Sequence, residues 1–250
     1  MIDDDYQYPI SNIQHLISNS MLKELINQYY SELKKDREQH HFYVTDAGKC
    51  PRAVFFKFKK APAEAMEPRI LMMFDHGDHI HQLIMKPLFG VRKIQVVAAE
   101  INIPPQELIA GRADAIISNG KELYVLDIKS INGQIFKSLN VPKEEHINQI
   151  QLYLHFFKQK KGILLYVNKD SQELKEFFVD YDTKIAEGLL KELSELKVKI
   201  DRNIVPSRIL NWPEDWQCQY CQFKEICKIT GEKEVDWEVF KKKIESQPRT

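Results

Sequence analysis

Apolar and polar residues change their period several times along the chain, and the clearest change lies between residues 111 and 130. Two apolar runs there flank Asn119-Gly120, a dipeptide that favours a tight hairpin turn. The second run, residues 122–130, is almost continuously apolar, which is typical of a central strand covered on both faces. The pattern therefore predicts a β-hairpin whose second strand lies in the middle of the fold.

Helical spacing of apolar residues predicts helices on both sides of this hairpin. The expected helices are residues 11–17, 21–37, 45–58, 69–89, 142–158 and 183–202. Further strands are expected at residues 92–103, 162–167 and 174–179. This order of elements indicates an α/β core with a central mixed sheet flanked by helices.

Charge and composition narrow the class of protein. The chain has 36 acidic and 36 basic residues, so its bulk charge gives no support to nucleic-acid binding and any such surface must be local. No apolar run reaches membrane-spanning length, and the acidic start MIDDD is unlike a signal peptide. We therefore expect a cytoplasmic protein without a membrane partner.

Asp127 and Lys129 lie two positions apart near the end of the predicted central strand, so their side chains share one face. Asp114, on the preceding strand, can lie opposite them. Two carboxylates and a lysine on a buried strand are unfavourable unless something compensates, and a divalent metal ion does so well. The alternative is a simple ion pair between Asp127 and Lys129, with Asp114 as a turn residue. The twelve-residue interval between the two aspartates, across a turn, favours the metal site.

Two predicted helices carry polar residues on informative faces. His81 falls on the apolar stripe of the helix before the hairpin, one turn after Gly77, which allows close approach of a strand or ligand. An inward-facing histidine is more often a hydrogen-bonded core residue than a metal ligand. In the helix after the hairpin, His146, Gln149 and Tyr153 share one face.

A basic segment lies at residues 49–60, where aromatic residues alternate with cations and no acid occurs. Its basic residues are Lys49, Arg52, Lys57, Lys59 and Lys60. Such a segment can follow a phosphate backbone, or it can be a solvated helix face, and the sequence favours neither.

The chain has four cysteines, Cys50, Cys218, Cys221 and Cys227. In a reducing compartment, clustered cysteines bind metal more often than they form disulfides. Four thiolates fit either zinc or an iron–sulfur cluster. Because structural zinc sites usually use two close cysteine pairs, the division into one and three favours a [4Fe–4S] cluster that would join the two ends of the chain. The alternative is four unrelated buried thiols.

Taken together, these motifs resemble RecB-type nucleases of the PD-(D/E)xK superfamily. The resemblance is to the branch with a C-terminal iron–sulfur cluster, which includes CRISPR-associated exonucleases and the AddB-type nuclease domain. The matching residues, in the family's order, are Cys50-Pro51-Arg52, Gly77-x3-His81, Gly111-x2-Asp114, Asp127-x-Lys129, Gln149-x3-Tyr153 and Cys218-x2-Cys221-x5-Cys227. Asp127 stands where many members of this branch have glutamate, and the first 40 residues match no motif.

The resemblance implies a restriction-endonuclease-like core and a role for each matching residue. The implied ligands of Mg²⁺ or Mn²⁺ are His81, Asp114, Asp127 and the carbonyl of Ile128. Lys129 would orient the attacking water or help to deprotonate it. The implied nucleic-acid contacts are Gln149 and Tyr153, to which the basic segment adds Arg52 and Lys49. The four cysteines would hold the [4Fe–4S] cluster, with zinc as the less favoured occupant.

Four regions are expected along the chain. Residues 1–90 form an N-terminal helical region that contributes Cys50 and His81, and residues 91–205 form the nuclease core. Residues 206–240 carry the cysteine cluster, and residues 241–250 form a polar tail.

The implied activity is that of a metal-dependent DNA exonuclease, a hydrolase of ester bonds, acting on single strands or free ends. Two alternatives use the same fold. One is a structure-specific endonuclease that trims DNA during CRISPR spacer acquisition or phage recombination, with the adaptation or recombination proteins as partners. The other is a DNA-binding module without activity. The sequence leaves open the polarity of digestion, the preference for DNA over RNA and the oligomeric state.

Overall fold

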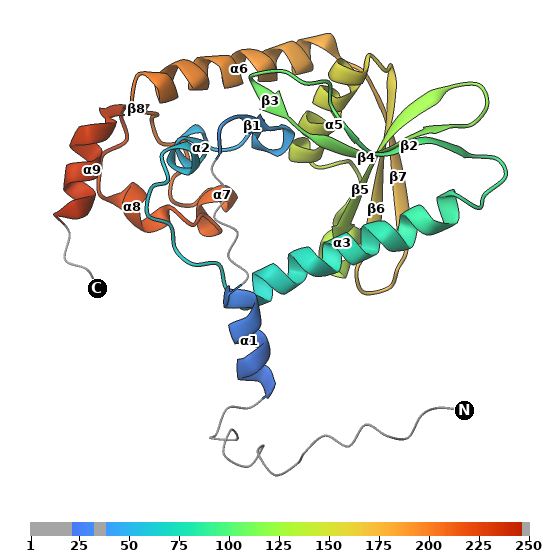
Figure 1. Ribbon diagram of the computed structural model, residues 1–250, viewed down its shortest axis with the longest axis horizontal. Helices are drawn as coiled ribbons and strands as arrows, with labels where there is room; N and C mark the ends of the chain where they lie inside the picture. Colours follow the sequence, from blue (N-terminus) through green and yellow to red (C-terminus); the bar gives the residue numbers. More distant parts are fainter. Residues whose placement is uncertain (1–21, 33–38, 247–250) are drawn as a thin grey trace, which may run out of the picture.

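A five-stranded mixed sheet forms the centre of the protein (Figure 1). The structure, a computed structural model, describes residues 22–32 and 39–246. In spatial order the strands are β2 (Gln95–Asn102), β4 (Arg112–Ser118), β5 (Leu123–Ile131), β6 (Lys161–Asn168) and β7 (Leu174–Asp180). The β5–β6 pair is parallel and the other pairs are antiparallel. The predicted α/β fold with a central mixed sheet is therefore confirmed.

The hairpin between β4 and β5 has the turn that its sequence predicts. The side-chain Oδ1 of Asn119 accepts hydrogen bonds from the backbone N–H groups of Lys121 (3.0 Å) and Glu122 (2.9 Å). Gly120 has a φ of +84°, a conformation that glycine adopts without a steric penalty. The turn fixes the register, so that Ser118 pairs with Leu123.

Helices cover both faces of this sheet. Helix α3 (Pro68–Leu88) packs Ile80, Ile84 and Leu88 against one face. Helix α5 (Glu144–Phe157) packs Ile150 and Leu154 against the other face, and α6 (Thr183–Asp201) lies outside α5. Side chains that leave the central strand β5 on either face therefore meet a helix.

Strand β4 pairs with β5 only from Ala115 to Ser118, so its first three residues, 112–114, have no partner on β5. The ladder between the two strands runs from the Ser118–Leu123 pair to the Ala115–Leu126 pair, whereas β4 continues to pair with β2 as far as Arg112. The separation opens the sheet beside the middle of β5, between the helices on its two faces.

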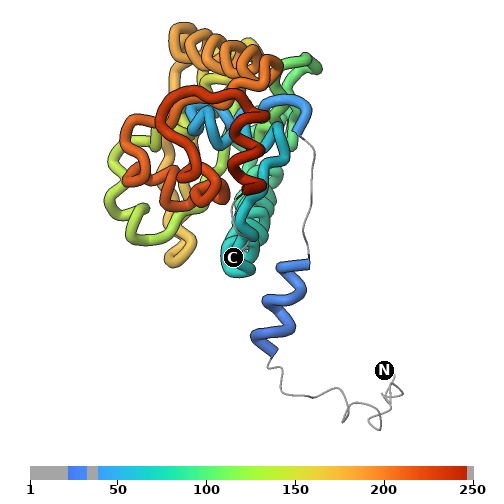
Figure 2. Tube along the Cα trace, turned by 90° about the vertical axis from the view of Figure 1, so that its left-hand side faces the viewer, coloured from blue at the N-terminus to red at the C-terminus, as the bar shows by residue number. Residues whose placement is uncertain are grey.

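The remaining elements lie outside the central sheet and its covering helices, and two pairs of short strands among them join segments that are far apart in sequence. They are α1 (Leu22–Glu32), β1 (Phe42–Tyr43), the 3₁₀ helix η2 (Val44–Asp46), α2 (Pro51–Phe58), β3 (Ile109–Ala110), α4 (Gly133–Ser138), β8 (Ile204–Val205), α7 (Trp216–Gln219), α8 (Lys224–Lys228), β9 (Val235–Asp236) and α9 (Trp237–Glu245). β1 pairs with β3, and β8 pairs with β9. Figure 2 shows α1 projecting from the body.

Several element boundaries differ from the expectation. The predicted helix 45–58 is two pieces, η2 and α2, because Pro51 suits the first position of a new helix. Helix α4 was not predicted; Asn132 begins it by accepting a hydrogen bond from the N–H of Ile135 (2.8 Å). The predicted polar tail needs correction, because α9 continues to Glu245, with Phe240 buried and Ile244 packed against the core.

Predicted features at the ends of the chain lie partly outside the described residues. The expected helix 11–17 and residues 247–250 fall there, as do the ends of the expected helix 21–37, of which the structure describes α1. No helix among the described residues is long and apolar enough to cross a membrane.

Arg52 on α2 is buried, with 1% of its surface exposed, and it binds backbone carbonyls from near the C-terminus. Its Nε donates to Pro206 O (2.7 Å), Nη1 to Gly231 O (3.2 Å) and Nη2 to Lys233 O (3.0 Å). This guanidinium has no surface left for a phosphate, so the predicted nucleic-acid contact of Arg52 is corrected. It holds the N- and C-terminal parts of the chain together instead.

Replacing Arg52 by methionine should lower the free energy of unfolding by about 3 kcal/mol, because buried carbonyls lose their donors. The matched control is Arg112→Met, which removes a 60% exposed arginine paired with Glu100 and should cost less than about 1 kcal/mol. Chemical unfolding of both variants measures the difference. Equal effects would contradict the tethering role of Arg52.

Candidate active site

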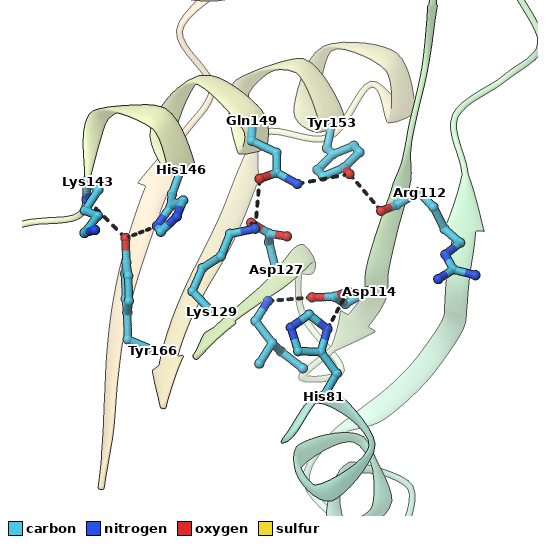
Figure 3. A network of polar contacts seen from close by, with 11 residues as sticks. His81, Arg112, Asp114, Asp127, Lys129, Lys143, His146, Gln149, Tyr153 and Tyr166 are labelled. Carbon is cyan, nitrogen blue, oxygen red and sulfur yellow. Dashed lines mark hydrogen bonds and ion pairs between the residues drawn. The ribbon is translucent and has the colours of Figure 1, made fainter. Parts of the chain in front are cut away.

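Asp127 and Lys129 project from β5 toward α5 (Figure 3). Lys129 Nζ lies 2.8 Å from Asp127 Oδ2, and only 4% of the Asp127 side chain and 16% of the Lys129 side chain are exposed. The ion pair that formed the alternative to a metal site is therefore present. This ion pair does not exclude a metal ion, because Asp114 lies close to Asp127 and supplies a second carboxylate.

Asp114 lies on β4 where that strand leaves β5. Its Oδ2 accepts a hydrogen bond from the backbone N–H of Ile128 (2.6 Å), which takes the place of a strand partner. Its Oδ1 lies 3.3 Å from Nδ1 of His81 on α3. The hydrogen bond to Asp114 raises the pKa of His81, although burial of the imidazole opposes that shift. The gap in the sheet thus lets α3 reach the carboxylates from the opposite face.

The Asp127 carboxylate lies in an unfavourable environment. Burial raises its pKa, and the nearby ammonium of Lys129 counteracts the effect. Asp127 Oδ2 is at ion-pair distance from Lys129, but the geometry makes no hydrogen bond to that oxygen among the described residues. A buried carboxylate oxygen without a hydrogen bond is a suitable ligand for a divalent cation.

Lys129 is held in place by a chain of hydrogen bonds (Figure 3). Lys129 Nζ donates to Gln149 Oε1 (2.8 Å), Gln149 Nε2 donates to the hydroxyl of Tyr153 (3.3 Å), and that hydroxyl donates to Arg112 O (2.7 Å). Tyr153 is only 2% exposed, so the predicted direct contact of Tyr153 with nucleic acid is corrected. Gln149 and Tyr153 orient Lys129 instead.

The predicted ligands lie close together but are arranged in pairs. His81 is paired with Asp114, and Lys129 is paired with Asp127. Within residues 22–32 and 39–246, no three His, Cys, Asp or Glu side chains surround one point as ligands of a single metal ion would. A bound cation would therefore need small side-chain movements that separate these pairs.

The four cysteines line one cavity, although Cys50 is far from the others in sequence. All four are free thiols. Burial is the largest cause that raises the pKa of three of them, namely Cys50, Cys218 and Cys221. Arg52 Nη1 lies 3.7 Å from Cys227 Sγ, and Arg208 donates to the carbonyl of Cys227. The structure therefore brings together the four residues that the sequence analysis grouped.

The basic segment at residues 49–60 is mainly structural. Lys57 pairs with Asp46 (3.2 Å), Lys59 donates to Asn203 (2.6 Å), and Lys49 lies 4.9 Å from the ring centre of Trp216. Intramolecular partners thus engage these three cations, and Lys49 also lies close enough to Lys143 and His146 for its charge to act on them.

Comparison with known proteins gives a family for this arrangement. The model of the PD-(D/E)XK nuclease superfamily matches residues 20–228, which is most of the chain and includes the carboxylate site and all four cysteines. The chain belongs to this nuclease superfamily.

Two relatives support the assignment. The CRISPR-associated exonuclease Cas4 of Saccharolobus solfataricus is 29% identical over 222 residues, which cover 85% of this nuclease and 98% of the relative. The crystal structure of SSO0001 is 25% identical with a TM-score of 0.50, covering 83% of this chain and 96% of that one. The nuclease is therefore similar to these proteins along nearly their whole length.

His146 is a further polar residue at the site of this nuclease. It precedes Gln149 by one turn of α5, and its Nδ1 lies 2.7 Å from the hydroxyl of Tyr166 on β6 (Figure 3). Burial, reinforced by the charges of Lys129, Lys143 and Lys49, lowers the pKa of His146 to about 3. The sequence places His146 on the face of Gln149, but the hydrogen bond to Tyr166 depends on how α5 packs on the sheet.

The low pKa of His146 predicts a loss of stability in acid. An unfolded histidine takes up a proton below its ordinary pKa of about 6.5, whereas folded His146 does not until about pH 3. The free energy of unfolding therefore falls as pH falls through this window, by about 2 kcal/mol between pH 7 and pH 5 from this residue. His146→Gln should show a smaller drop in thermal stability between these two pH values. An identical drop in both proteins would contradict the assignment.

Proposed function

We propose that this nuclease hydrolyses the phosphodiester bonds of DNA with Mg²⁺ or Mn²⁺ and works from free ends, preferring single strands. The observation that carries the proposal is the placement of two carboxylates and a lysine close together between helices on both faces of the sheet, with Asp127 buried and the other two partly exposed. Nucleases of this superfamily typically use divalent metal ions.

The residues fit such an ion. Asp114 and Asp127 supply carboxylate oxygens, and the proposed set is completed by the imidazole of His81 and the carbonyl of Ile128. Oxygen ligands are those that Mg²⁺ and Mn²⁺ prefer. When bound, the cation stabilises negative charge on the phosphate and lowers the pKa of a bound water.

Lys129 provides the second component of the proposed reaction. Its ammonium is paired with Asp127 and donates a hydrogen bond to Gln149, so the position of the nitrogen is fixed. In this position it can donate to the attacking water or to a non-bridging oxygen of the scissile phosphate. Water gives up one proton to solvent as its oxygen bonds to phosphorus, the P–O bond to the leaving nucleotide breaks, and the leaving oxygen takes up a proton, so that protons balance.

A preference for DNA ends is supported by the relative from Saccharolobus solfataricus. That protein is a CRISPR-associated exonuclease, and the similarity extends over 98% of its length. We propose the same substrate class for this chain, with proteins of CRISPR adaptation or recombination as its partners. The division of the chain into an N-terminal helical region, a nuclease core and a cysteine-cluster region also stays a proposal.

Replacing Asp114 or Asp127 by asparagine, or Lys129 by methionine, should reduce cleavage of end-labelled single-stranded DNA in Mn²⁺ by at least about a hundredfold. Each change removes a charge from the site while preserving the shape of the side chain. The measurement is the initial rate of nucleotide release.

The matched control is Asp180→Asn, because Asp180 is an exposed carboxylate on β7 of the same sheet. This variant should keep the wild-type rate. Full activity in any of the three site variants contradicts the assignment, and rapid cleavage of circular single strands would show endonuclease action instead.

We further propose that the four cysteines hold a [4Fe–4S] cluster. A zinc ion with four Zn–S bonds of about 2.3 Å brings the sulfurs within about 3.8 Å of one another. The four thiols line one cavity, and their division into one and three along the chain favours a cluster over a zinc ion. The cluster would join α2 to the segment after α6, where Arg52 already makes its contacts.

Cys221→Ser should abolish the absorbance band near 400 nm and lower the iron content from about four atoms per chain, because one ligand is lost. The matched control is Thr230→Val, since the Thr230 hydroxyl is buried without a hydrogen-bond partner in the described chain. This control should keep its iron. Anaerobically purified wild-type protein that contains zinc and no iron would contradict the proposal.

A further inference from the structure

The hydrogen bonds around Tyr166 fix which nitrogen of His146 carries a proton. The backbone N–H of Lys143 donates to the Tyr166 hydroxyl (3.1 Å), and His146 Nδ1 lies 2.7 Å from the same oxygen. Tyr166 is fully buried, and its hydroxyl has no other acceptor among the residues described. Its proton must therefore go to Nδ1 of His146, since a buried hydroxyl without an acceptor is unfavourable.

A neutral imidazole that accepts at Nδ1 carries its hydrogen on Nε2. His146 is partly exposed, and no hydrogen bond from Nε2 is found within the described part of the chain. A preoriented donor on a rigid helix is therefore available beside the carboxylate site.

The surroundings of His146 favour an anion. Three ammonium groups act on the imidazole, from Lys129 in the site, Lys143 at the start of α5 and Lys49. Asp127, which is 2.8 Å from Lys129, and Glu145, which is 3.7 Å from Lys143, offset part of this charge. The remaining positive potential attracts an anion while it keeps the imidazole neutral.

We propose that His146 donates its Nε2–H to a phosphate of the bound nucleic-acid strand, beside the phosphate that is cleaved. The proposal rests on the function proposed above. One helical turn, about 5 Å, separates His146 from Gln149, which orients Lys129. His146 is thus a substrate-binding residue adjacent to the reacting phosphate, and Tyr166 is the positioning residue that holds its tautomer.

The experiment measures binding of a fluorescent single-stranded oligonucleotide in Ca²⁺ at several salt concentrations. His146→Ala should weaken binding about tenfold at every salt concentration, the effect of one hydrogen bond to a charged acceptor. The slope of log affinity against log salt should not change, because a neutral donor displaces no counterions. Lys143→Gln removes a charge, and should reduce the slope by about 0.7. His146→Gln, which keeps an N–H donor, should recover most of the affinity.

The chain offers a matched control on the same helix. His155 Nδ1 lies 2.8 Å from the hydroxyl of Tyr181, the same kind of pair, nine residues further along α5. His155→Ala should bind like wild type. Unchanged affinity in His146→Ala, an equal loss in His155→Ala, or no recovery in His146→Gln would each overturn the proposal.

Cleavage by the same proteins separates this inference from the proposed function. In Mn²⁺, His146→Ala should raise KM about tenfold and change kcat less than about threefold, because the contact binds substrate before the reaction. A wild-type protein that binds through His146 but cleaves no DNA would refute the nuclease mechanism and retain the binding contact. If the wild-type protein cleaves DNA and His146→Ala changes neither binding nor KM, the binding contact is refuted and the nuclease mechanism is retained.

Discussion

Burying a carboxylate is unfavourable unless a positive charge or a hydrogen-bond donor compensates, and Asp127 is held in such a position. Lys129 supplies the charge at 2.8 Å, but its geometry leaves Asp127 Oδ2 without a hydrogen bond among the described residues. The apolar residues of β5 place Asp127 there, since the strand is buried by helices on both faces. The remaining polar residues of the site can be understood as responses to this one buried charge.

The polar groups around Asp127 come from three elements, namely β4, α3 and α5. Asp114 enters because β4 leaves β5, and its carboxylate then takes the N–H of Ile128 that would otherwise lack a partner. His81 reaches the same carboxylate from α3, and α5 supplies the hydrogen bonds that fix Lys129. In this arrangement His81 pairs with Asp114 and Lys129 pairs with Asp127, and a divalent cation can take the place of the positive partner in each pair. Far from it, Arg52 and the cysteine cavity tie the chain ends together, which keeps α2 packed against the segment after α6.

Most of the fold and much of the site follow from local patterns. The Asn119-Gly120 turn predicts the hairpin, and the two-residue period of β5 places Asp127 beside Lys129. The burial and the partners of several polar side chains depend on long-range packing, which local sequence patterns do not predict. Arg52 has the sequence character of a phosphate ligand, yet its guanidinium is enclosed by carbonyls of residues 206–233. Tyr153 is buried for the same kind of reason, and the partner of His146 lies on a strand twenty residues away. The catalytic roles of Asp114, Asp127 and Lys129 stay predictions.

The proposed cleavage mechanism requires a divalent ion at the position between the two aspartates. Crystals soaked in Mn²⁺ and measured near the manganese absorption edge test this directly. We expect one strong anomalous peak within about 2.3 Å of carboxylate oxygens of both Asp114 and Asp127, with His81 and Lys129 turned from their present partners to make room. An empty site under saturating Mn²⁺, with the His81–Asp114 and Lys129–Asp127 pairs intact, would contradict it.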